Sequence, residues 1–299
     1  MNALLLAASI FLALLGYGIL RNEFCKNLQE NHADLYSFNI VSSLLSAVTL
    51  VIITMCTGSL GVPSLYTVLM GALYGLATAL CAVLSMAALE NGPLSYSNLI
   101  ISCAMVIPAL SGLVLYGEVV TAWQYVGIAL MLASFACAVD KNDKGSGMTL
   151  KWLVLCLGAF VCSGAVGVMQ KLHQKSSHAG ELGVFLVIAF VFYVAFSVAM
   201  TLYYTSVKGE KITVTHPKKL KKSLVLAIVS GVGIALVNQI NLHLSGVMDA
   251  IILYPVNNGA SMILTAAAGI ILWKEKLNRR QWVGLILGGI AILLLCNIL

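Results

Sequence analysis

The sequence predicts an all-α polytopic membrane protein with ten transmembrane helices, arranged as two inverted five-helix repeats. Three observations predict this fold: the composition, the recurrence of long apolar runs, and the similarity between the two halves of the chain. The 299 residues are 60% hydrophobic and only 9% charged, with a mean hydropathy of +0.98. A soluble domain carries about 25% charged residues, so this chain has too little charge to cover a surface that faces water.

Uncharged apolar runs recur along the chain, each about 17–25 residues long, which is enough to cross roughly 30 Å of hydrocarbon. The runs are continuous and do not alternate with polar residues, which favours helices over barrel strands. The first run lacks a basic leader and a small-residue cleavage site, so we expect a helix there and not a cleaved signal peptide. The ten predicted helices span residues 3–20, 35–56, 65–89, 94–115, 123–139, 152–170, 182–207, 224–243, 250–273 and 282–299.

The basic residues predict the orientation of these helices. Of the 17 lysines and arginines, 15 lie in the connections after the first, fifth, seventh and ninth helices. Only Lys171 and Lys175 are expected in a connection on the other side. Cytoplasmic connections carry an excess of Lys and Arg, so this bias predicts cytoplasmic odd-numbered connections and outward-facing termini.

The two halves of the chain are similar in sequence. Residues 118–130 align with residues 275–287, and the aligned pairs include Gln124 with Gln281 and Gly127 with Gly284. We therefore predict a first repeat over residues 1–139, a polar linker over 140–149 and a second repeat over 150–299. Because five helices are an odd number, the second repeat enters the membrane from the opposite side, and inverted repeats of this kind underlie alternating access in transporters.

Short motifs at the ends of the predicted helices add a family resemblance. They are the stretch 88–95 (Ala-Leu-Glu-Asn-Gly-Pro-Leu-Ser), Tyr-Gly-Glu at 116–118, and Gln-Tyr-Val-Gly at 124–127. The second half carries Leu-Trp-Lys-Glu-Lys-Leu at 272–277 and Gln-Trp-Val-Gly at 281–284. In this order and spacing the chain resembles the drug/metabolite transporter superfamily, in its ten-helix EamA-type branch, over both halves.

The resemblance implies an exporter or importer of small metabolites, whose central cavity is lined by the third, fourth, eighth and ninth helices. The chain departs from the family pattern at Lys274, where relatives carry glycine, and it lacks their basic C-terminal tail. The resemblance also implies cytoplasmic termini, whereas the charge bias favours termini outside. The orientation is therefore open.

Neutral polar side chains are the candidates for solute binding, because no Asp, Glu, Lys or Arg lies near the middle of a predicted helix. A side-chain amide without a partner costs several kcal/mol in hydrocarbon, so these groups should point toward protein or a wet cavity. They line the solute in one interpretation and bond neighbouring helices in the other. The candidates share helical spacings on three predicted helices: Tyr254, Asn257, Asn258 and Ser261 on the ninth; Asn238 and Asn241 on the eighth; Ser95 and Asn98 on the fourth.

Titratable groups at helix ends are the candidates for proton coupling. They are Glu90, His243 and Asp249, each of which can equally be a solvated charge at a helix end. Glu118 and Glu275 are expected to complement a positive helix end and nearby cations. The pairs Gly71/Gly75 and Gly284/Gly288 have the spacing of close helix packing, which we expect to be intramolecular.

The chain shows no pattern for a metal site, a cofactor or a catalytic grouping. Its eight cysteines form no Cys-x-x-Cys pair, no Gly-rich phosphate loop is present, and the basic residues are dispersed over short connections. We therefore predict a secondary transporter of an amino acid, amine or drug-like solute in the plasma or inner membrane. It is expected to be a monomer or weak homodimer, with no catalytic residue and no nucleic-acid partner. The alternatives are a membrane sensor or assembly subunit and, less favoured, an intramembrane enzyme.

Overall fold

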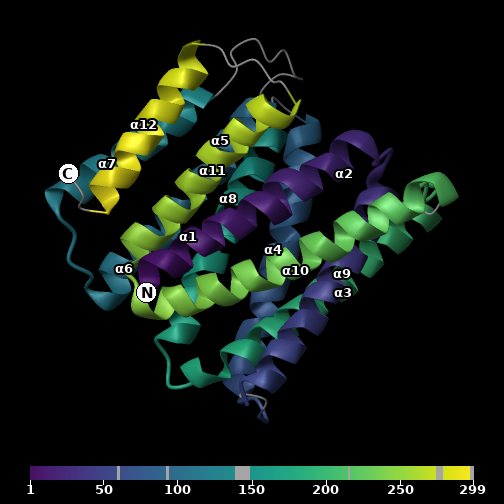
Figure 1. The fold of residues 1–299 in the computed structure, drawn as a ribbon, viewed down its shortest axis with the longest axis horizontal. Coiled ribbons are helices and arrows are strands. Elements are labelled where there is room, and N and C mark those ends of the chain that lie inside the picture. Colours follow the sequence, from purple (N-terminus) through teal and green to yellow (C-terminus); the bar gives the residue numbers. More distant parts are fainter. Residues whose placement is uncertain (59–60, 92–93, 139–148, 215, 274–278, 297–299) are drawn as a thin grey trace. The chain divides into compact units, whose positions relative to one another are not determined.

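A computed structural model of the chain confirms the all-α fold (Figure 1). It describes residues 1–58, 61–91, 94–138, 149–214, 216–273 and 279–296. Two breaks in regular helix follow the first and fifth helices, a π-helical stretch at Leu14–Leu20 and a 3-10 turn at Cys103–Met105. The α-helices are α1 (Asn2–Ala13), α2 (Arg21–Asn27), α3 (His32–Cys56), α4 (Leu65–Asn91), α5 (Leu94–Ser102), α6 (Val106–Tyr116), α7 (Ala122–Ala138), α8 (Leu150–Gln174), α9 (Leu182–Ser206), α10 (Pro217–Val247), α11 (Ala250–Trp273) and α12 (Arg279–Leu295).

Seven helices in the described part of the chain are long and apolar enough to cross a bilayer, and two shorter apolar helices lie at residues 2–16 and 122–137. The polytopic membrane fold is therefore confirmed, and the count of ten spans stays a prediction. Two helices extend beyond the apolar runs that predicted them. α8 continues to Gln174 and α10 begins at Pro217, because backbone hydrogen bonding continues through polar residues at the ends of a span.

The chain divides into two compact units. One unit, unit 1, takes residues 3–79 and 173–243, and the other, unit 2, takes residues 80–172 and 244–299. Each unit draws on both halves of the sequence, so this division does not test the two predicted repeats, which stay a prediction.

In unit 1, α3 and α9 lie side by side and run antiparallel (Figure 1). Tyr36 near the start of α3 stacks on Tyr204 near the end of α9, with ring centroids 5.7 Å apart. At the other end of the pair, Gly183 of α9 lies against Thr54 of α3. In unit 2, α7 and α12 form a second antiparallel pair, in which Ser134 donates to the Gly284 carbonyl at 2.7 Å and Gln124 donates to the Leu295 carbonyl at 3.3 Å.

Helix α3 buries most of its polar residues and exposes a stripe of apolar ones, the reverse of the pattern in a soluble protein. Its buried polar residues include Asp34, Asn39, Ser42, Ser43, Ser46 and Thr54. Its exposed residues follow helical spacing as an apolar stripe formed by Leu44, Val48, Ile52 and Met55. A surface of this kind is suited to lipid, and the buried hydroxyls bond backbone carbonyls; Ser46, for example, donates to Gly231 of α10 at 2.7 Å.

Asp34 joins the start of α3 to the connection before α10. Its carboxylate is fully buried and accepts hydrogen bonds from the backbone N–H and the hydroxyl of Thr213, both at 2.6 Å, and from the N–H of Val214 at 3.1 Å. Bonds to a charged acceptor are about twice as strong as neutral ones, so this single side chain holds the connection against α3.

The glycines of α4 allow close approach of α9 within unit 1, as the Gly71/Gly75 spacing predicted. A Cβ built on Gly71 would lie 2.9 Å from the Phe185 carbonyl oxygen, and one on Gly75 would overlap the Ala189 carbonyl oxygen. In unit 2, a Cβ on Gly288 would lie 2.9 Å from the Ser134 hydroxyl. The expectation that both glycine pairs pack within the molecule is confirmed.

Candidate functional site

Helix α10 carries the predicted polar residues of unit 1. Both polar atoms of the Asn238 side chain have hydrogen-bond partners. Its Oδ1 accepts from the Tyr74 hydroxyl at 3.1 Å, and its Nδ2 donates to the Ile234 carbonyl at 2.9 Å. Gln239 and Asn241 differ from it. Their side-chain oxygens, Oε1 and Oδ1, are buried and have no hydrogen-bond partner within the described part of the chain. Asn241 was among the predicted site residues, whereas Gln239 was not.

Helix α11 carries the predicted polar residues of unit 2. Tyr254 is buried and its hydroxyl donates to the Gly167 carbonyl of α8 at 2.6 Å, which is a bond between helices. Asn257 and Ser261 are half-buried and Asn258 is exposed. The face predicted from the spacing therefore mixes a helix-bonding phenol with an exposed amide, and its role in solute binding stays a prediction.

The remaining predicted residues lie near helix ends. Ser95 and Asn98 lie on α5, and their side chains lie outside the described part of the structure. Glu90, His243 and Asp249, the residues predicted for proton coupling, are all exposed. Their coupling role stays a prediction.

A buried ion pair in unit 2 was missed by the sequence analysis. Lys171 lies in α8 and is 1% exposed, so the expectation that it sits in a connection is wrong. Its Nζ lies 2.5 Å from Glu118 Oε1, donates to the Met248 carbonyl at 2.7 Å and lies 5.9 Å from the centre of the Tyr116 ring. The apolar run predicts a helix end at Gln170, one residue before Lys171, whereas α8 continues to Gln174.

The local backbone explains how Glu118 reaches this position. Gly117 ends α6 in the left-handed conformation, with φ at 61°, and the Glu118 N–H bonds back to the Gly112 carbonyl at 3.3 Å. The Gly117 N–H bonds the Leu113 carbonyl at 3.2 Å, which is the hydrogen bond of an αL C-cap, a conformation that glycine adopts without strain. The carboxylate then folds over Gly112, where a Cβ would overlap it, and Oε2 accepts from the Ala250 N–H at 2.8 Å at the start of α11.

The expected role of Glu118 is thus confirmed, because it complements both a positive helix end and a cation. Its equivalent Glu275 lies outside the described residues. Within unit 2 the pair ties three segments together: the end of α6, the last turns of α8 and the start of α11.

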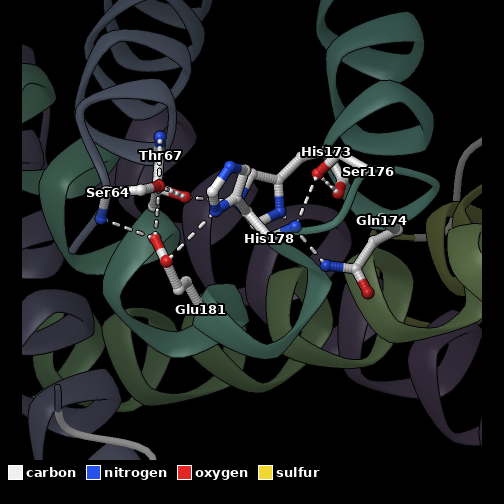
Figure 2. A network of polar contacts seen from close by, with 7 residues as sticks. All are labelled: Ser64, Thr67, His173, Gln174, Ser176, His178 and Glu181. Carbon is white, nitrogen blue, oxygen red and sulfur yellow. Dashed lines mark hydrogen bonds and ion pairs between the residues drawn. The ribbon is translucent and has the colours of Figure 1, made fainter.

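A second polar cluster, the His173 cluster, lies in unit 1 where α8 ends and α4 begins (Figure 2). The imidazole of His173 is fully buried, and its Nε2 lies 3.1 Å from the Thr67 hydroxyl oxygen. Its Nδ1 lies 3.2 Å from Gln174 Nε2. The ring packs on Phe185, with centroids 4.4 Å apart. Sequence spacing gave no signal for this cluster, because its residues come from two stretches of the chain, residues 64–67 and 173–181, that lie more than 100 positions apart.

The acidic member of the His173 cluster is Glu181. Its Oε2 accepts from the N–H and the hydroxyl of Ser64, at 2.9 and 2.8 Å, and its Oε1 lies 3.3 Å from His178 Nδ1 (Figure 2). Ser64 caps α4, since its hydroxyl oxygen accepts from the Thr67 N–H at 3.2 Å. A carboxylate at this helix N-terminus is favoured by the helix dipole. Glu181 and His178 are partly exposed, so the cluster runs from a solvated carboxylate to a buried imidazole.

Comparisons with known proteins agree with the fold. Residues 150–297 match the model of the EamA-like transporter family. Twenty-eight chains from solved structures match this one. One of them is titled only "Crystal structure of protein". It is 13% identical in sequence to this chain, the TM-score between the two is 0.73, and the match covers 99% of each chain. At that identity the likeness shows the fold alone. No curated protein matches the sequence.

Proposed function

We propose, from the premise that this chain belongs to the EamA-like transporter family and so to the drug/metabolite transporter superfamily, that it moves a small organic solute with N–H donors by alternating access. The family and the membrane-spanning helices make the chain a multi-pass membrane transporter. The class of solute, the cell membrane as its location and the mechanism are our proposal.

The observation that carries the class of solute is the unpartnered side-chain oxygen of Asn241 on α10. A buried acceptor without a donor costs about 1–3 kcal/mol. Gln239 Oε1 and Asn241 Oδ1 both have this cost within the described part of the chain. A solute that brings an N–H group to Asn241 Oδ1 recovers this cost on binding, whereas Gln239, two residues away, lies on another face of the helix. Amines and amino acids carry such donors. The neighbouring Asn238 oxygen does not compete for the N–H groups of the solute, because it already accepts a hydrogen bond from the Tyr74 hydroxyl.

Alternating access is supported by the inverted relation that the two sequence repeats predict. Two similar halves of opposite orientation can exchange conformations, which opens one site to either side of the membrane in turn. The antiparallel pairs α3 with α9 and α7 with α12 join equivalent helices of the two predicted repeats, as this relation requires.

Replacing Asn241 by leucine tests the proposed solute site. We expect the purified variant to be as stable as the wild type without ligand, or more stable, because the substitution removes an unsatisfied acceptor. The wild type should be stabilised by about 2.7 kcal/mol by a compound at a hundred times its dissociation constant, and the variant should lose most of this gain. A thermal-shift screen against ethylamine, putrescine, lysine, leucine, nucleosides and sugars measures both.

Asn258→Leu is the matched control, since Asn258 is also a helical amide but is exposed. It should leave the shift caused by the compound unchanged. If Asn258→Leu abolishes the shift and Asn241→Leu does not, the solute binds at α11 and not at the unpartnered oxygen of Asn241. If no compound with N–H donors stabilises the wild type while a sugar does, the proposed solute class is wrong.

A further inference from the structure

The start of α10 carries a basic surface that the proposed solute site does not use. The apolar span of α9 ends at Ser206 and that of α10 begins at Lys219, so the residues between them lie at one end of two membrane-spanning helices. Lysines at the end of a span lie at the level of the phospholipid headgroups. Six lysines occur in this stretch and the first turn of α10: Lys208, Lys211, Lys218, Lys219, Lys221 and Lys222.

In the first turn of α10, the lysines on either side of Lys221 have acidic partners. Lys219 pairs with Glu30, and the Lys222 Nζ lies 2.6 Å from Glu23 Oε1. Lys221 differs from both, because it is exposed and forms no ion pair within the described part of the chain. Its ammonium group is therefore available to a molecule outside the protein.

The other acidic residues of these segments do not supply a partner for Lys221. The Asp34 carboxylate is buried and bonded to the Thr213 hydroxyl, and the Glu210 carboxylate accepts from the backbone N–H of Ala33 at 2.8 Å. Residues 21–34 and 208–222 together carry eight basic and four acidic side chains, an excess of four positive charges. This end of unit 1 therefore attracts anions.

Lys221 also lies on the exposed face of α10. Leu224, Val225, Ile228 and Val232 follow it after three, four, seven and eleven residues, and all four are exposed. This spacing places them on the same side of the helix as Lys221, where they form an apolar stripe in line with the lysine. The methylene stem of a lysine can lie along such a stripe while its ammonium group reaches the headgroup layer.

We propose that Lys221 binds the headgroup of an anionic phospholipid whose acyl chain lies along the apolar stripe of α10. Charge and shape both favour this partner, because a phospholipid joins an anionic group to a chain that fits an apolar surface. The cytoplasmic leaflet is the anionic one, and the bias of basic residues predicts that this end of α10 lies there. The inference does not depend on the solute proposed above.

The experiment titrates the full chain, solubilised in detergent and freed of lipid, with phosphatidylglycerol or with phosphatidylcholine of the same acyl chains. Native mass spectrometry counts the bound lipids and gives their dissociation constants. Lys221→Gln should bind phosphatidylglycerol about fivefold more weakly than the wild type, which is the usual contribution of one lysine near an anionic surface. Its binding of phosphatidylcholine, which has no net charge, should be unchanged. Lys221→Arg keeps the charge and should bind both lipids as the wild type does.

Lys175→Gln is the matched control. Lys175 is also exposed, but it follows the end of α8 and does not lie on the apolar stripe. This variant should bind both lipids with wild-type affinity. Because Lys221 and Lys175 are exposed, neither substitution should change the thermal unfolding of the lipid-free protein, and that measurement verifies that the variants fold.

A soluble competitor distinguishes a lipid site from a simple anion site. Glycerol 3-phosphate carries the phosphate without acyl chains, and at the concentration of the lipid it should displace none of it. Displacement would overturn the inference, because the site would then need no apolar stripe. Unchanged binding of phosphatidylglycerol to Lys221→Gln would also overturn it, as would equal weakening by Lys221→Gln and Lys175→Gln, which would show a general effect of net charge.

Discussion

Replacing Lys171 by methionine is expected to lower the free energy of unfolding by about 3–5 kcal/mol, because removing one partner of a buried ion pair leaves the other charge uncompensated. The charge left behind is that of Glu118, whose side chain is 6% exposed. Methionine fills much the same volume, so lost packing contributes little. Glu118→Gln should cost a similar amount, since it leaves the buried Lys171 ammonium without a carboxylate partner.

The double variant separates charge from packing. If the cost comes from an unpaired charge, Lys171→Met combined with Glu118→Gln should be more stable than either single variant, because both charges are then gone. Lys175→Met, four residues further along and exposed, should change stability by no more than about 0.5 kcal/mol. Unfolding of the detergent-solubilised protein by heat or by sodium dodecyl sulfate measures all four. Equal stability of the Lys171 and Lys175 variants would show that the pair contributes nothing.

Replacing Gly75 by alanine is expected to cost about 1–3 kcal/mol, the usual cost of adding a group to a closely packed contact. The new methyl group would meet the backbone carbonyl of Ala189, and a backbone atom cannot rotate away as a side chain can. α4 and α9 must therefore move apart within unit 1. The same unfolding measurement detects the loss.

Gly289→Ala is the matched control for this prediction. Gly289 also lies inside a helix, and a Cβ there would meet nothing within 4 Å. Because alanine is the better helix former by about 1 kcal/mol, this variant should be slightly stabilised. A result in which both variants lose stability equally would mean that helix contact is not the cause.

The composition and the length of the apolar runs were enough to predict the fold class. A surface that faces lipid must consist of apolar residues, and these can be read directly from the sequence. α3 illustrates the limit of that information: its exposed stripe and its buried serines are both present in the sequence, but only the packing shows which face is covered. Helices α8 and α10 extend beyond the bounds that the apolar runs predict, since a helix continues where its polar residues find partners.

The candidate site could be predicted only in part, because spacing reports which residues share a face and not what they meet. Asn238 and Asn241 share a face, yet one amide is bonded to Tyr74 and the other has an unpartnered oxygen. Lys171 and Glu118 are 53 positions apart, and Thr67 is 106 positions from His173. Pairings over such separations depend on the three-dimensional path of the chain, which no local pattern encodes.

The order of synthesis gives α3 a particular difficulty. Its buried groups bond residues made much later: Asp34 bonds Thr213, 179 positions on, and Ser46 bonds Gly231, 185 positions on. At about 5–20 residues per second, these partners emerge from the ribosome roughly 10–35 s after α3. During that interval Asp34 and Ser46 lack the partners that Thr213 and Gly231 later supply. Insertion of α9 and α10 completes α3, and a nascent chain that ends before them should be the form that cellular quality control recognises.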